Sequence, residues 1–103
     1  MSQVIFSIKY EILPEKREEY LDVVRELKNL VKAEGLLSYS VYEKKSKTNV
    51  FEEIYLFDSK ENFENFDDDQ DERVDLLMTK LSDMIKGHST EYSTLNEVVS
   101  NNN

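Results

Sequence analysis

The chain has 103 residues, of which 39% are hydrophobic and 34% are charged, and its formal net charge is −9 at pH 7. This length predicts a single small domain, and the negative charge argues against nucleic acid or an anionic membrane as a partner, since both repel an acidic surface. The absence of cysteine excludes disulfides, thiolate metal sites and a cysteine nucleophile.

No segment of the sequence resembles a secretory signal or a membrane anchor. The N-terminal MSQVIFSIKYEILPEK lacks a basic segment followed by an apolar run. No apolar run approaches the roughly 20 residues that cross a bilayer. We therefore expect a cytoplasmic protein.

The first third of the chain predicts a strand followed by a helix. From Val4 to Ile12, apolar and polar side chains alternate with one exception, which is typical of a strand. Pro14 can open a helix because no N–H is needed there, and we expect this helix to extend to about Ala33. Gly35 then suits the left-handed position just past a helix end.

Two strands are predicted in the middle of the chain, Leu36–Glu43 and Val50–Phe57, joined by the polar turn KKSKTN. Both are rich in aromatic and β-branched residues, and both carry apolar residues on each of their two faces. A sheet with one face open to water would alternate more cleanly. We therefore expect the second face to be covered, and in a chain this short the expected cover is a second copy of itself.

A second helix is predicted after these strands. Asp58 or Ser59 can cap it, and Asp58 with Glu61 three residues later resembles a capping box. Phe63 and Phe66 are three residues apart and therefore share one face of this helix.

The acidic segment DDDQDE at residues 67–72 admits two interpretations. Asp67, Asp69 and Asp71 alternate as in the start of a calcium-binding loop. That loop needs glycine at its sixth position and glutamate at its twelfth, where this chain has Glu72 and Met78. We therefore predict no metal site, and interpret the segment as a solvated acidic stretch that leads into the next helix.

The last third predicts a helix and a strand. The helix runs from about Glu72 to Lys86 and ends at Gly87, and the mostly polar strand runs from about His88 to Val98. We expect this strand to lie at the edge of the sheet or to cross into a partner chain.

The predicted order is strand, helix, strand, strand, interrupted helix and strand. This is the split βαβ or ferredoxin-like arrangement, an α+β fold with a four-stranded antiparallel sheet and helices on one face. One domain should cover residues 1–98, and residues 99–103 should form a disordered tail.

Two segments resemble the antibiotic biosynthesis monooxygenase-like family. GLLSYSVYEK is similar to the family's G-c-l-x-Y-x-v-y segment, and Phe51, Phe57-Asp58-Ser59 and Asn62-Phe63 resemble its F … W-x-S-x-x-a-l/f segment. The resemblance covers about residues 3 to 98. It implies the dimeric α/β barrel, in which two ferredoxin-like units join their open sheet faces, and a cofactor-independent oxidation of aromatic polyketides or quinols. Other members of the superfamily degrade haem or act as isomerases.

The sequence departs from the family at three places. Many members have tryptophan where this chain has Phe57, and histidine near Asn65 or Phe66. The haem-degrading members use an asparagine on the first strand, where this chain offers Ser7 or Ile8. These differences argue against haem degradation. They also support an alternative, a non-catalytic dimeric module whose interior is filled by its own phenylalanines.

The candidate site combines aromatic rings with one carboxylate. Glu53 shares a strand face with Tyr55 and Phe57, and a buried carboxylate has a raised pKa and can accept a proton. It can equally pair with Lys9 or with lysines of the turn. We predict Glu53 and Tyr55 as catalytic residues that need no metal or cofactor, acting on a small aromatic molecule held between sheet and helices. The predicted substrate-binding residues are Phe6, Tyr39, Phe57, Phe63 and Phe66.

Overall fold

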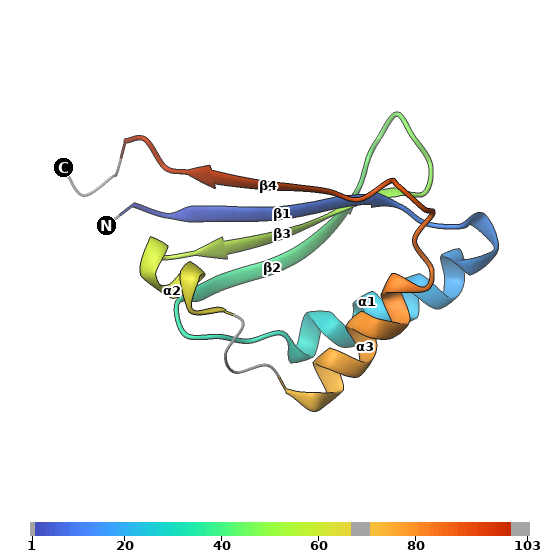
Figure 1. The fold of residues 1–103 in the computed structure, drawn as a ribbon, viewed down its shortest axis with the longest axis horizontal. Coiled ribbons are helices and arrows are strands. Elements are labelled where there is room, and N and C mark those ends of the chain that lie inside the picture. Colours follow the sequence, from blue (N-terminus) through green and yellow to red (C-terminus); the bar gives the residue numbers. More distant parts are fainter. Residues whose placement is uncertain (1, 67–70, 100–103) are drawn as a thin grey trace.

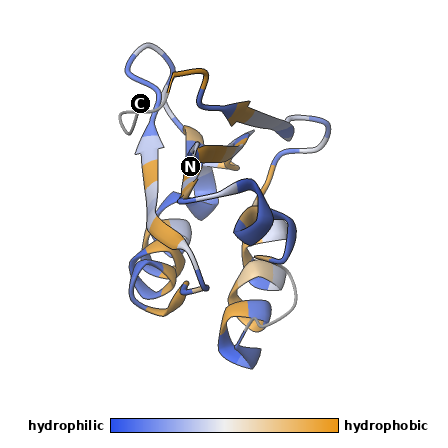
Figure 2. Cartoon of the chain, turned by 90° about the vertical axis from the view of Figure 1, so that its left-hand side faces the viewer, coloured by the Kyte–Doolittle hydropathy of each residue, from blue (hydrophilic) through white to orange (hydrophobic). Residues whose placement is uncertain are grey.

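The computed structural model of the chain describes residues 2–66 and 71–99. In chain order its elements are β1 (Val4–Glu11), the 3₁₀ helix η1 (Pro14–Lys16), α1 (Arg17–Leu30), β2 (Leu36–Glu43), β3 (Val50–Phe57), α2 (Lys60–Glu64), α3 (Glu72–Ser82) and β4 (Glu91–Asn96). The strands form one antiparallel sheet in the order β2-β3-β1-β4. Helices α1 and α3 lie beside each other below this sheet (Figure 1, Figure 2). This is the predicted ferredoxin-like α+β fold.

Side chains of each strand point alternately to the two faces of the sheet. We call the face toward the helices the inner face and the opposite one the outer face. The register between β1 and β3 sets Phe6 opposite Tyr55 and Tyr10 opposite Phe51. Directly opposed residues of an antiparallel pair share a face. The hydroxyl of Tyr10 lies 2.8 Å from that of Tyr20 on α1, which identifies the face of Tyr10 as the inner face.

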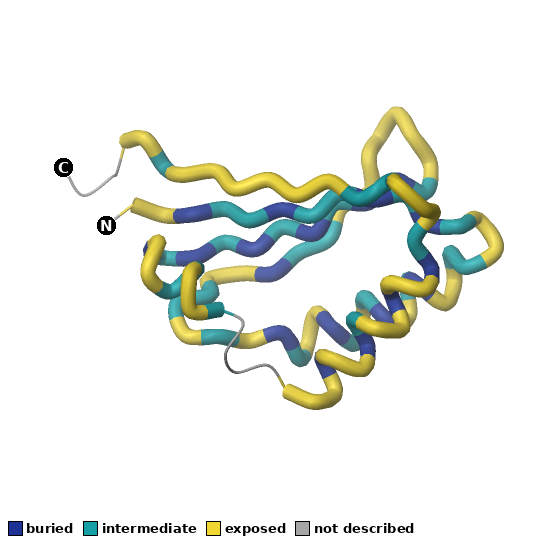
Figure 3. Tube along the Cα trace, in the orientation of Figure 1, coloured by how far each residue is buried: buried dark blue, intermediate teal, exposed yellow. Residues whose placement is uncertain are grey.

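The hydrophobic core lies between the inner face and the helices (Figure 3). Its largest fully buried apolar side chains are Tyr10, Ile12, Tyr20, Leu27, Tyr55, Phe57, Val74 and Met84. Removal of this apolar surface from water is the main driving force for folding. Edge strand β4 is exposed along its whole length and contributes little to the core. Among the described residues, no helix combines the length and hydropathy needed to cross a membrane.

The outer face combines large apolar side chains with polar and charged ones, including Lys9, Glu52 and Glu91. Ile5 of β1 lies between Leu56 of β3 and Leu95 of β4. Leu95 is 57% exposed, and Tyr42, on the same face of β2, is 60% exposed. Apolar groups gathered on an open sheet face are typical of an interaction surface. Pairing of two chains through this face stays a prediction.

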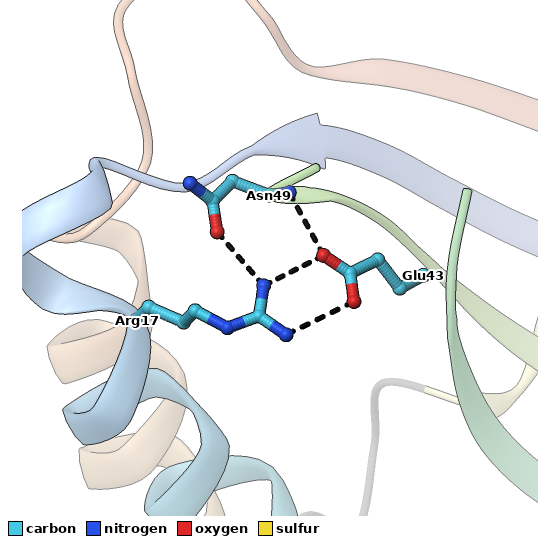
Figure 4. A network of polar contacts seen from close by, with 3 residues as sticks. All are labelled: Arg17, Glu43 and Asn49. Carbon is cyan, nitrogen blue, oxygen red and sulfur yellow. Dashed lines mark hydrogen bonds and ion pairs between the residues drawn. The ribbon is translucent and has the colours of Figure 1, made fainter. Parts of the chain in front are cut away.

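The N-terminal end of α1 is attached to the β2–β3 hairpin by a polar network (Figure 4). Arg17 donates hydrogen bonds of 2.6 and 3.0 Å to the two carboxylate oxygens of Glu43, and one of 2.8 Å to Asn49 Oδ1. The N–H of Asn49 donates to Glu43 Oε2 at 2.9 Å. Asn49 adopts a left-handed φ of 70°, which asparagine tolerates better than most residues. The network holds the pKa of Glu43 at about 2, chiefly through Arg17.

Helix α1 ends before its predicted end at Ala33. After Leu30, Val31 takes an extended conformation (φ −69°, ψ 112°), and its side chain is buried in the core. Gly35 is therefore not the residue just past the helix. It has a left-handed φ of 77° in the turn before β2, where a Cβ would also collide with the side chain of Asn62.

Helix α3 is also shorter than predicted and ends at Ser82. The chain after it forms an isolated bridge between Ile85 and Ile12, which directly follows β1, and the N–H of Lys86 donates to the carbonyl of Glu11. These contacts replace further helical hydrogen bonds. The predicted stop at Gly87 is wrong, since the left-handed residue in this connection is His88, with a φ of 64°.

Three further predictions need correction or limits. The capping box does not form, because Ser59 caps α2 by accepting from the N–H of Asn62 at 3.2 Å, while Asp58 accepts from the Asn62 side chain at 2.8 Å. Strand β4 forms only over Glu91–Asn96 and is shorter than the predicted strand from His88 to Val98. Residues 100–103 of the predicted tail lie outside the described residues.

Candidate functional site

A cleft of about 640 Å³ lies between the inner face of the sheet and helices α2 and α3. Its sheet side is formed by Phe6 and Ile8 of β1, Tyr55 of β3 and Tyr92 of β4. Its other described lining residues are Phe63, Glu64, Phe66, Val74, Asp75 and Met78. This size and mostly apolar lining are typical of a small-molecule site.

The strand registers bring the sheet side of the cleft together. Phe6 lies directly opposite Tyr55, and Ile8 lies opposite Tyr92. On α3, Val74 and Met78 are four residues apart and therefore share one helix face. The cleft thus follows from strand parity and helix periodicity across elements that are distant in sequence.

The aromatic rings of the cleft contact one another. The ring of Phe6 lies 5.7 Å from Tyr55, 5.6 Å from Phe63 and 6.2 Å from Tyr92. The ring of Tyr55 lies 5.3 Å from that of Phe66. Centroid distances in this range are those of favourable aromatic pairs, so the walls of the cleft are preformed by ring–ring packing.

A buried carboxylate lies behind this aromatic wall. Glu53 is 2% exposed and accepts hydrogen bonds from three tyrosine hydroxyls. Tyr10 donates to its Oε2 at 2.8 Å, whereas Tyr39 and Tyr55 donate to its Oε1 at 2.8 and 3.2 Å. The hydroxyl of Tyr10 also bonds that of Tyr20 at 2.8 Å. Strands β1, β2 and β3 and helix α1 all contribute to this network.

The surroundings of Glu53 shift the pKa of its carboxyl group. Burial raises the pKa of the Glu53 carboxyl above its usual value, and the hydrogen bonds from the three tyrosines oppose that rise. Burial and the nearby charge of Glu53 raise the pKa of Tyr10 and Tyr39. The pairing of Glu53 with Lys9 that the sequence left open does not occur, because Lys9 contacts Glu91 at 2.9 Å on the outer face.

Glu53 contacts the cleft through its neighbours. Ile8, directly across the sheet, and Tyr55, which bonds the carboxylate, both line the cleft. Tyr55 is therefore the group that connects the cleft to Glu53 by a hydrogen bond. A proton removed from a bound molecule could reach the carboxylate by way of this hydroxyl.

The structure brings the predicted site residues into one cluster. Some of them line the cleft, and others lie behind it in the core. Phe6, Tyr55, Phe63 and Phe66 line the cleft. Tyr39 lies behind it in the core, with its ring 4.8 Å from that of Tyr55. Phe57 is also a core residue, and its ring lies 5.6 Å from Phe63 and 5.1 Å from Phe66. The catalytic and binding roles stay predictions.

The site residues predicted from the sequence leave out part of the cluster. Tyr10 follows Phe6 by four residues on the same strand face, so strand parity alone could have added it to the candidates. Tyr20, Met78 and Tyr92 could not be found in this way, because nothing local indicates which helix face or edge strand meets the cleft.

The described residues show no metal centre. Over residues 2–66 and 71–99, no group of three or more histidine, aspartate or glutamate side chains is placed to hold a metal ion. Of the calcium-like segment, Asp67 and Asp69 lie outside the described residues. Asp71 caps α3 by accepting from the N–H of Arg73 at 2.8 Å.

The fold and the cleft define a ferredoxin-like protein with an aromatic-lined site between sheet and helices. The model of the antibiotic biosynthesis monooxygenase family matches residues 3–71, and the chain belongs to this family. No curated protein matches the chain.

Solved structures support the fold. A conserved protein from Methanosarcina mazei shares 18% identity over 92% of each chain, with a TM-score of 0.76. SnoaB, a cofactor-independent oxygenase from Streptomyces nogalater, shares 12% identity over 96% of each chain, with a TM-score of 0.74. A conserved protein from Bacteroides thetaiotaomicron shares 14% identity over 92% of this chain and 97% of its own, with a TM-score of 0.72. Identities this low establish the fold alone.

Proposed function

We propose that the chain is a cofactor-independent monooxygenase that binds a small aromatic, quinol-type molecule in the cleft. One observation carries the proposal: an aromatic cleft lies next to a buried carboxylate, and a tyrosine belongs to both. Family membership and the similarity to SnoaB, described as a cofactor-independent oxygenase, are consistent with it.

The proposed chemistry begins with removal of a proton from the bound quinol. Tyr55 accepts this proton as it passes its own to Glu53, so one negative charge moves from the carboxylate to the substrate. Tyr10 and Tyr39 hold the carboxyl group in position during the exchange. The quinol anion then donates electrons directly to molecular oxygen.

The reaction balances without an external reductant. Quinol and O₂ give hydroxyquinone and water, so one oxygen atom enters the ring and the other is released. All four electrons that reduce O₂ come from the substrate. The protein contributes ring binding, proton transfer and exclusion of water from the reacting anion.

An oxygen electrode tests the proposal with a panel of benzene, naphthalene and anthracene quinols and phenols. The wild-type protein should accelerate oxygen uptake above the uncatalysed rate for at least one compound. Glu53→Gln should lower that acceleration by about a hundredfold, the usual contribution of a general base, while circular dichroism shows an intact fold. Uptake at the uncatalysed rate with every compound, or full activity in Glu53→Gln, would contradict the proposal.

One observation favours the alternative, a non-catalytic dimeric module. Phe57, which is fully buried, packs between Phe63 and Phe66, so the chain fills part of the interior with its own rings. A protein that neither binds these aromatic molecules nor accelerates oxygen uptake would support this alternative.

We also propose that two copies pair through the outer faces of their sheets. The exposed apolar side chains of that face support the pairing, as does the implied family architecture. A dimer would bury Leu95 and Tyr42 and leave the cleft, on the inner face, available to a ligand.

A further inference from the structure

The rim of the cleft carries two charged side chains among the residues that the structure describes, and both are carboxylates. Glu64 ends α2, Asp75 lies in the first turn of α3, and both are exposed. The remaining described lining residues are aromatic or aliphatic. No described lysine, arginine or histidine lines the cleft to balance these charges.

A third carboxylate lies behind the wall of the cleft. Glu53 is 2% exposed, and its hydrogen-bond donors among the described residues are tyrosine hydroxyls, not cations. The charge of an ionised Glu53 is therefore not cancelled by a salt bridge. The two rim carboxylates, together with Glu53 when it is ionised, give the cleft a negative potential, in a chain whose formal net charge is −9.

The aromatic rings of the cleft also favour a positively charged ligand. Phe6, Tyr55, Phe63 and Tyr92 border it, and the faces of such rings carry partial negative charge. An ammonium group above an aromatic face is attracted by it, more strongly as water is excluded. Rings and carboxylates together are the chemistry that recognises an organic cation.

We propose that the cleft selects an aromatic molecule that carries a positively charged amine, with its ring among the phenylalanines and its ammonium group between Glu64 and Asp75. This inference rests on the proposed function, because it names the substrate class of the same cleft. The amine also serves the chemistry, since it offsets the negative charge that moves onto the ligand when Glu53 takes the proton. Aromatic carboxylates should be excluded.

Three probes of equal ring size test the charge preference by titration calorimetry: 1-naphthylmethylamine, 1-naphthalenemethanol and 1-naphthoate. We expect the amine to bind about tenfold more tightly than the alcohol, from two exposed ion pairs and a cation–ring contact. The carboxylate should bind more weakly than the alcohol. The advantage of the amine should shrink in about 1 M salt, which screens exposed charges beyond about 3 Å.

Two sets of variants locate the effect. In the double variant Glu64→Gln/Asp75→Asn, the amine should lose most of its advantage, while the alcohol binds as before. Glu61→Gln is the matched control, because it removes the same charge from α2 at a position that does not line the cleft. Met78→Trp, which fills the cleft from α3, should weaken amine and alcohol alike.

The outcomes separate this inference from the proposed function. Equal binding of amine and carboxylate, or a preference that persists in Glu64→Gln/Asp75→Asn, overturns the charge selection and leaves aromatic binding intact. Binding of none of the three probes overturns the aromatic-binding function itself, and the charge selection with it.

Discussion

Tyr39 and Tyr55 donate hydrogen bonds of 2.8 and 3.2 Å to the same carboxylate oxygen, Oε1 of Glu53. Tyr10 serves the other oxygen at 2.8 Å. A buried carboxylate is tolerated when its oxygens have such donors. The longest of the three bonds belongs to Tyr55, whose ring borders the cleft. The shorter hydrogen bonds to Glu53 thus come from Tyr10 and Tyr39, which do not line the cleft.

Loss of one donor should destabilise the fold. Tyr39→Phe removes a hydrogen bond to a buried charge, and we expect the free energy of unfolding in urea to fall by about 1.5–3 kcal/mol. Tyr20→Phe is the control, because its hydroxyl bonds Tyr10 and not Glu53, and it should cost about 1 kcal/mol. A Tyr39→Phe variant no less stable than the control would contradict the importance of this contact.

The raised pKa of Glu53 should make stability depend on pH. The folded chain holds this proton more tightly than the unfolded chain, since burial raises the pKa of the carboxyl in the folded state. The folded state therefore loses stability as pH rises from the usual carboxyl range through the raised pKa.

The comparison with Glu53→Gln, which does not titrate, isolates this effect. Urea unfolding at a series of pH values should show the stability difference moving in favour of Glu53→Gln as pH rises. A constant difference, or one that moves in favour of the wild type, is the opposite of this expectation.

The Arg17–Glu43 contact should have the reverse dependence. The pKa of Glu43 is lowered to about 2 in the folded state, so its stabilising contribution is present above the usual carboxyl pKa and is lost as pH falls toward 2. In Arg17→Gln, NMR titration should show the pKa of Glu43 rising toward its usual value.

Arg25→Gln is the matched control for this titration. Arg25 pairs with Asp22 at 2.6 Å on the exposed surface of the same helix, and its loss should leave the pKa of Glu43 unchanged. A Glu43 pKa that stays near 2 in Arg17→Gln would show that Arg17 is not the main cause.

The outer sheet face should control assembly. Leu95→Lys places a charge on this face and should lower the molar mass measured by light scattering from that of a dimer to that of a monomer. Leu76→Lys is the control, because Leu76 is similarly exposed, at 60%, but lies on α3. A wild-type monomer, or equal effects of both substitutions, would count against pairing through the outer face.

The fold could be predicted from sequence where local patterns decide. Strands β2 and β3 have the predicted bounds. Their residue types favour β-strands, Gly35 directly precedes β2, and a polar turn separates the two strands. Helix ends were predicted less well, since long-range contacts end them: Val31 joins the core, and Ile85 pairs with Ile12.

The candidate site, like the fold, could be predicted where local patterns determine it and not where long-range packing does. Strand parity placed Glu53 and Tyr55 on one face. Phe63 and Phe66 both line the cleft, but they do not share a helix face as predicted, because α2 ends at Glu64. The contact of Tyr10 with Tyr20 depends on how α1 packs on the sheet, which periodicity does not determine. The positions of the rim carboxylates likewise depend on the placement of two helices.

The most direct test of the account is an NMR titration of methyl-labelled methionine with a naphthalene quinol under exclusion of oxygen. Met78 lines the cleft, whereas Met84 is buried elsewhere in the core at 1% exposure. We predict a saturable shift of the Met78 methyl signal, from the ring current of the bound quinol, with the Met84 signal nearly unchanged. An unshifted Met78 signal at saturating quinol, or equal shifts of both signals, would contradict the cleft as the aromatic-binding site.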